Sequence, residues 1–91
     1  MKRPPRSTPE AAEMLAIQAL GFIAEDPQRL GDFLAATGIT AEQIRAVAGG
    51  PGFLVGVLEH MLGDESLLLA FAASAGIDPA EVARARGALG G

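Results

Sequence analysis

The side chains that could carry out chemistry are few and scattered along the chain. His60 is the only histidine, and its acidic neighbours Glu59 and Asp64 form a carboxylate–imidazole cluster in the sequence. The helix that carries His60 is expected to end at Leu62, which interrupts the one-turn spacing between His60 and Asp64. A structural histidine is therefore the simpler interpretation. A single histidine also excludes any triad or metal site within one chain that needs two.

The nucleophilic side chains lack neighbours that could activate them. Ser7, Ser66 and Ser74 lie in a tail or in one helix, and the only lysine, Lys2, lies in the tail. The chain has no cysteine, which excludes disulfides, thiolate catalysis and zinc–sulfur sites. The glycine-rich stretch 49–52 precedes no Lys-Ser or Lys-Thr pair, so it does not match a phosphate-binding loop. We expect no enzyme activity, no metal and no cofactor.

The charge of the chain is divided unevenly. The net charge is −4, but Lys2, Arg3 and Arg6 lie in the first six residues. From Ser7 onward four arginines stand against all eleven acidic residues, which leaves this part at −7. An acidic body disfavours nonspecific binding to nucleic acid or to anionic lipid. No segment has the roughly 20 apolar residues that cross a bilayer, so we expect a cytoplasmic protein without a membrane partner.

Cap signals and apolar spacing predict an all-α fold. Hydroxyl or aspartate caps followed by proline start helices, and Gly38 and Gly76 end them, because only glycine takes the left-handed conformation without strain. No run alternates with a period of two, so no strand is predicted. The prediction is a compact orthogonal bundle of about six short helices, in one domain over residues 9–91 behind a disordered basic tail at 1–8. The helices are expected at about 9–25, 27–37, a short stretch after Thr40, 53–62, 65–75, and from Asp78-Pro79 to an end that fades out at Gly87 and Gly90-Gly91.

The core is expected to be aliphatic and rich in alanine, with 49% apolar residues and four Phe as the only aromatic side chains. Residues 14–24 are apolar on nearly every helical face, which predicts a central helix surrounded by the others. Met14 and Met61 are interpreted as core filler. Phe33 and Phe71 are predicted to be equivalent core anchors.

An internal similarity links the two parts of the chain at an offset of 38 residues. Residues 26–39 and 64–77 share an aspartate at the start, a phenylalanine in the middle and Gly-Ile at the end. Two three-helix halves, about 12–50 and 51–88, are expected to share a shape. Duplication of one unit would explain the similarity, and so would convergence, because caps and cores favour the same residues.

One pattern resembles the helix-turn-helix motif of DNA-binding proteins. It has a small residue in the first helix, glycine at the turn and apolar anchors in the second helix, at Ala72, Gly76-Ile77, Val82 and Ala85. An earlier copy spans residues 34–47, where Leu34 replaces the small residue. Tight helix–turn–helix packing requires the same spacing in proteins that bind no DNA.

The cations near these two copies are few. Arg84 and Arg86 lie in the second copy, and Arg45 lies in the first. Each copy also carries a glutamate beside its arginines, Glu81 or Glu42. These three arginines are the candidate partner contacts, but they offer little phosphate neutralisation.

Two segments resemble a known family, and the likeness extends from about residue 11 to residue 91. The most distinctive stretches are AEMLAIQALGFIAEDPQRLGDFLAATGI and FLVGVLEHMLGDESLLLAFAASAGIDP. They are similar to short alphaproteobacterial proteins that are catalogued only as a domain of unknown function. The resemblance implies a cytoplasmic bacterial protein, and it brings no activity, cofactor or catalytic residue with it.

Caps and core account for nearly every side chain, which favours a non-catalytic protein-interaction module. Such a module would bind a protein partner or a second copy of itself, through apolar surface left exposed on a small body. The alternative is a nucleic-acid-binding protein of the helix-turn-helix kind.

Overall fold

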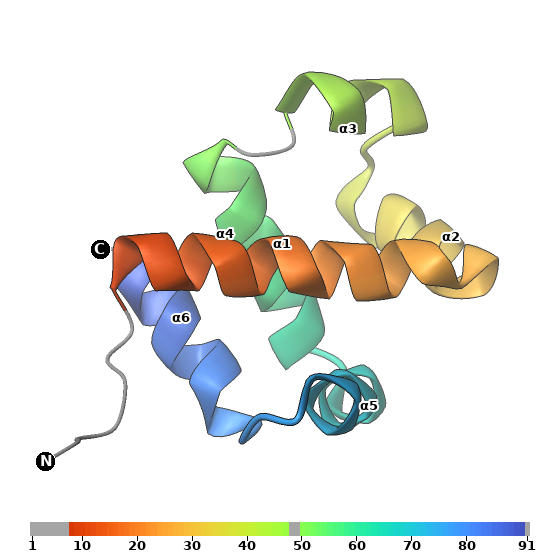
Figure 1. The fold of residues 1–91 in the computed structure, drawn as a ribbon. Helices are drawn as coiled ribbons and strands as arrows, with labels where there is room; N and C mark the ends of the chain where they lie inside the picture. Colours follow the sequence, from red (N-terminus) through yellow and green to blue (C-terminus); the bar gives the residue numbers. More distant parts are fainter. Residues whose placement is uncertain (1–7, 48–49, 91) are drawn as a thin grey trace, which may run out of the picture.

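A computed structural model describes residues 8–47 and 50–90, apart from the side chains at 41, 45, 47, 51 and 90. All regular secondary structure in these residues is helical, which confirms the all-α prediction. The six helices are α1 (Pro9–Glu25), α2 (Pro27–Thr37), α3 (Ala41–Val47), α4 (Pro51–Leu62), α5 (Glu65–Ala75) and α6 (Ala80–Gly90) (Figure 1). Of the predicted tail, only Thr8 lies within the described residues.

Helices α1, α2 and α5 begin at side-chain caps, as the sequence predicts. The Thr8 hydroxyl accepts a hydrogen bond from the Ala11 N–H at 3.1 Å and so starts α1. The Asp26 carboxylate caps α2, and the Asp64 carboxylate caps α5 by accepting from the Leu67 N–H at 3.2 Å. Each cap satisfies an N–H that the first helical turn leaves without a partner.

The short helix α3 begins with a reciprocal cap. The Gln43 N–H donates to the Thr40 hydroxyl at 3.1 Å, and the Thr40 N–H donates to the Gln43 side-chain oxygen at 3.0 Å. This arrangement is a capping box, in which two N–H groups are satisfied at once. Two glycines end helices in the left-handed conformation, Gly38 at φ 74° and Gly76 at φ 70°.

One predicted helix end was wrong by two residues. Helix α4 begins at Pro51 rather than at residue 53, because proline fits the first helical turn, where no N–H bond is lost. Helix α6 continues through Gly87 and ends at Gly90, within the predicted fading end. Glycine is tolerated inside a helix at a cost of about 1 kcal/mol, and Leu89 beyond it packs against the core.

Helices α1, α4 and α6 pack closely on one another (Figure 1). Helix α2 packs on α1 and contributes Phe33, and α5 packs on α4. The inner face of α1 consists mainly of alanine, which lets the neighbouring backbones approach closely. The buried side chains are Ala12, Ala16, Ala19 and Ile23 from α1, Leu54, Val57, Leu58 and Met61 from α4, Leu67, Phe71 and Ala72 from α5, and Val82 and Ala85 from α6.

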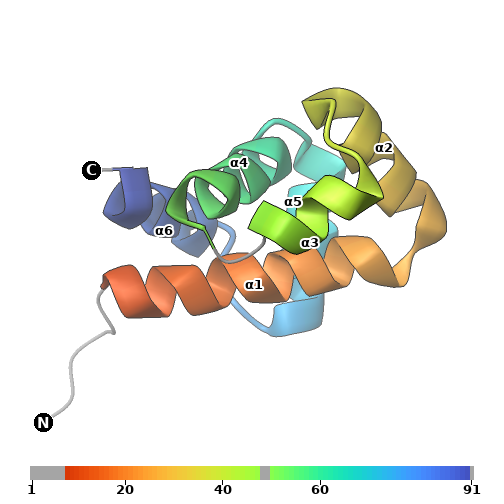
Figure 2. The same ribbon diagram turned by 90° about the horizontal axis from the view of Figure 1, so that it is seen from above.

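The prediction that α1 is surrounded on all faces was wrong. Figure 2 shows α1 along one side of the molecule, with α4 and α6 on its inner side. Met14 is 65% exposed and Ile17 is 53% exposed, so Met14 is not core filler, whereas Met61 is fully buried as predicted. The other helices pack on the alanine side of α1 and leave its opposite side to solvent.

The two similar segments share their local structure. Helices α2 and α5 both have 11 residues, an aspartate cap, a buried phenylalanine and a left-handed glycine at the end. Their partners in the proposed halves differ, because α6 packs on α1 and α4, whereas α3 is shorter and places Ile44 against the core. Whether the halves share one shape stays a prediction.

The two anchoring phenylalanines give a direct test of the core. Phe33 and Phe71 are 1% and 2% exposed. Truncating either to alanine is expected to cost about 3–5 kcal/mol, out of a total of about 5–14 kcal/mol for this length. Urea denaturation should show both variants to be marginally stable, and near wild-type midpoints would contradict this core.

Two glycines of α2 should respond to alanine in opposite directions. A methyl group added at Gly31 or at Gly38 meets no atom within 4 Å, so only the backbone differs. Gly31 is helical, and alanine there should raise the free energy of unfolding by about 0.5–1 kcal/mol. Gly38 has φ +74°, and alanine there should lower that free energy by about 1–2 kcal/mol. Changes of the same sign in urea denaturation would contradict this assignment.

Candidate functional site

Among the described side chains, the predicted arginine contacts Arg84 and Arg86 do not form one basic surface. Arg86 pairs with Glu59 of α4, and the Arg84 guanidinium lies 3.9 Å from the Glu81 carboxylate. Arg84 and Arg86 are two residues apart on α6, and residues at that spacing do not face the same side. Arg45 belongs to α3, and its side chain lies outside the described part of the chain.

The α5–α6 unit has the angle of a helix-turn-helix but little of its chemistry. The two helices meet at 98°, within the range of about 90–120° for that motif. Val82 and Ala85 bury one side of α6. Its exposed side carries Ala83, Arg84 and Gly87, of which only the arginine can contact a phosphate or a base edge.

Within residues 8–47 and 50–90, no single helix has the length and apolar character to cross a membrane. The α5 and α6 segments reach the required length and composition only when taken together, and the chain bends by 98° between them.

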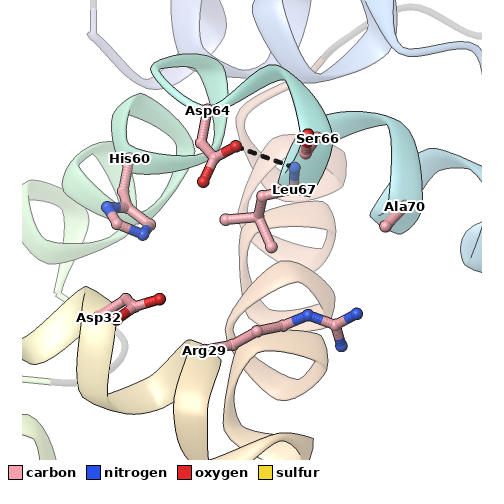
Figure 3. A pocket seen from close by; sticks show the side chains of 7 residues that line it. All are labelled: Arg29, Asp32, His60, Asp64, Ser66, Leu67 and Ala70. Atoms are coloured by element: carbon pink, nitrogen blue, oxygen red, sulfur yellow. Dashed lines mark hydrogen bonds between the residues drawn. The ribbon is translucent and has the colours of Figure 1, made fainter.

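The lone histidine lies at a small polar pocket of about 210 Å³. Figure 3 shows this pocket between α2 and the junction of α4 and α5, with the Arg29 guanidinium pointing away from His60. The His60 ring packs edge-on against Phe33, with ring centres 5.1 Å apart. The pocket is lined by Arg29, Asp32, His60, Asp64, Ser66, Leu67 and Ala70.

The two acidic neighbours of His60 in the sequence are occupied by structural contacts, while Asp32 and Ser66 line the same pocket. Asp64 caps α5, and Glu59 pairs with Arg86, so both acidic neighbours predicted for the histidine have other partners. The Arg29 guanidinium carbon lies 4.3 Å from the centre of the Phe22 ring. Among the described residues, no three His, Cys, Asp or Glu side chains are placed to hold a metal ion.

The largest departure from the sequence prediction is an exposed apolar stripe on α1. Met14 and Ile17 are three residues apart and so share one helical face. Gln18 and Gly21 continue this face and are exposed as well. We call these four residues the outer face of α1. The uniform apolar character of α1 gave the signal for it, but that character was interpreted as burial.

A second pocket, of about 260 Å³, adjoins the outer face and separates α1 from α5. In Figure 2 the last turn of α5 passes beneath α1 and emerges on its outer side. The Phe22 and Phe71 rings meet here, with centres 5.6 Å apart. We call this space the α1–α5 pocket, and it is lined by Gln18, Gly21, Phe22, Glu25, Phe71, Ser74 and Ala75.

These features define a small all-helical protein with an exposed apolar side on α1 and with several of its described polar side chains engaged in caps and pairs. The chain belongs to the family described as "Protein of unknown function (DUF3572)", which matches residues 9–91. The predicted resemblance to a domain of unknown function is thereby confirmed. No curated protein and no solved structure matches the chain.

The two arginines of α6 should differ in their effect on stability. Arg86→Ala removes a cross-helix pair whose side chains are 37% and 53% exposed, and it should lower the free energy of unfolding by up to about 1 kcal/mol. Arg84→Ala removes a looser contact and should change it by less than about 0.5 kcal/mol. Added salt should reduce the loss of stability only for Arg86→Ala. Urea denaturation at low and high salt checks this, and an equal cost for both variants would contradict the pairing.

Proposed function

We propose that this protein is a non-catalytic module that binds a protein partner through the outer face of α1. The observation that carries the proposal is the exposure of Met14 and Ile17, two of the three exposed large apolar side chains among the described residues. Burying such a side chain is worth about 1.5–3 kcal/mol. A contiguous apolar stripe on a small body is the usual mark of an interface.

The polar groups support a role without catalysis. The two carboxylates nearest to His60 in sequence serve as a helix cap and as an ion-pair partner, which leaves neither free to act as a base. Phe33 and His60 pack edge to face, a contact that suits a structural role. We also propose that the protein works in the cytoplasm, which its lack of cysteine supports.

A specific observation favours a second candidate, a helix-turn-helix protein that binds nucleic acid. The angle of 98° between α5 and α6 suits that motif, and Arg84 lies on the exposed side of α6. The acidic charge of the body works against it. A band shift at low salt that Arg84→Ala weakens would support this candidate, and no shift with mixed DNA would exclude it.

The outer face can be tested by placing charge on it. The double variant Met14→Glu and Ile17→Glu should keep its stability within about 0.5 kcal/mol, because both side chains are exposed, and it should lose its partner. A photo-crosslinker in place of Gln18, introduced in the cells that make the protein, should yield one discrete adduct with wild type and none with this variant.

A matched control adds the same charge elsewhere. Gln28 and Ala35 are exposed on α2, seven residues apart, and changing both to glutamate should leave the adduct intact. If the adduct still forms with the Met14→Glu, Ile17→Glu variant, the outer face is not part of the interface. An adduct that contains two copies of this chain would assign the face to self-association.

A further inference from the structure

The outer face of α1 and the α1–α5 pocket together show what kind of partner fits them. We infer that the partner presents an amphipathic helix with basic ends, which places a lysine or arginine side chain in the α1–α5 pocket. This inference rests on the proposed function and adds to it the chemistry of the partner.

The charges on α1 select a basic partner. Glu10 and Glu25 are exposed at the two ends of the helix, and the segment between them carries no lysine or arginine. The two glutamates are 15 positions apart, which corresponds to about 22 Å along a helix. The apolar side chains of Met14 and Ile17 lie between them. A complementary segment therefore has an apolar centre and a cation near each end.

The α1–α5 pocket gives one of these cations a specific place. Phe71 is buried and forms an apolar base, while Glu25 is exposed at the rim. Lysine and arginine combine a long apolar stem with a charged head, so their shape and charge match such a pocket. The Arg29 guanidinium already lies over the Phe22 ring, so the partner's cation is placed by Phe71 and Glu25 and not by a cation–π contact with Phe22. Arg29 itself lines the pocket beside His60, not this one.

Gly21 fits the same arrangement. A glycine in mid-helix costs about 1 kcal/mol relative to alanine, and no atom beyond its neighbouring helix backbone lies within 4 Å of the position that its missing Cβ would take, as is also true of Gly31. The packing of this chain alone therefore does not require a glycine there. Gly21 lines the α1–α5 pocket, and the lack of a side chain keeps the pocket open to a partner.

The same charges disfavour the other possible partners of this surface, which are a second copy of the chain, nucleic acid and anionic lipid. In a pair of α1 helices from two copies, glutamates would meet glutamates at both ends in either orientation, since α1 has no basic residue. Phosphate groups of nucleic acid and anionic lipid surfaces are repelled in the same way. A basic protein segment is the partner that matches both the apolar centre and the acidic ends of this surface.

The test is a selection from a displayed library of 18-residue helical peptides in which one face is fully randomised. The library is sorted for binding to the wild-type protein and then against the Met14→Glu, Ile17→Glu double variant. We expect the enriched peptides to carry apolar residues in the centre and lysine or arginine at both ends.

Single substitutions then test the pocket with the best peptide. Glu25→Gln keeps the shape of the rim and should weaken Kd about three- to tenfold. Gly21→Leu should fill the pocket and weaken Kd by at least about tenfold, whereas Gly31→Leu on α2, where a Cβ also meets open space, should leave Kd unchanged. Circular dichroism checks that each variant is folded, and Gly21→Ala gives a milder change at the same position.

The outcomes separate this inference from the proposed function. Enriched peptides with neutral or acidic ends would overturn the inference and leave the proposed function in place. An unchanged Kd for both Glu25→Gln and Gly21→Leu would show that no cation of the peptide binds in the α1–α5 pocket. If no peptide distinguished wild type from the double variant, both the inference and the proposed function would fail. A wild-type dimer in light scattering that the double variant disperses would make a second copy the occupant.

Discussion

The structure depends on the close approach of α4 and α6 to the alanine side of α1. Ala12, Ala16 and Ala19 are almost fully buried and contribute little volume. The larger side chains of the core therefore come from the facing helices, such as Leu58 and Val82. Because both partner helices occupy this one side, the opposite side of α1 around Met14 and Ile17 is left exposed, and the last turn of α5 reaches it only beside the α1–α5 pocket. The core and the exposed outer face are thus two consequences of one packing arrangement.

The sequence predicts the local structure of this chain well, because the signals that set it are themselves local. The cap of α2 at Asp26 and the left-handed end at Gly38 each depend on one residue and its near neighbours. The sequence does not predict which side of α1 is buried. Met14 is larger and more apolar than Ala16, yet Met14 is exposed and Ala16 is buried. When every face of a helix is apolar, periodicity cannot indicate which face packs, and here the small residues pack because they allow close approach.

The contacts at the candidate site could not be predicted for a related reason. Glu59 and Arg86 are 27 residues apart, and Phe22 meets Phe71 across two helices that do not adjoin in sequence. Such pairs depend on how the helices cross, and residue spacing within one helix does not predict the crossing. The helix-turn-helix-like spacing places the candidate arginines on their helices but does not predict their partners, and in the structure the charge of Arg86 is balanced by Glu59.

The features of α1 that work against stability are concentrated on one side of it. Gly21 weakens the helix, while Met14 and Ile17 hold apolar surface in water. Selection for stability alone would favour alanine at the first position and polar residues at the other two. Elsewhere in the chain, the helix caps agree with the fold, as Thr8 and Asp64 illustrate, although Gly31 and Gly87 also lie inside helices. Places where a sequence departs from such agreement are where a function imposes its own requirement. The outer face of α1 is such a place. A partner that covers it would bury Met14 and Ile17 and would give Gly21 a reason to lack a side chain.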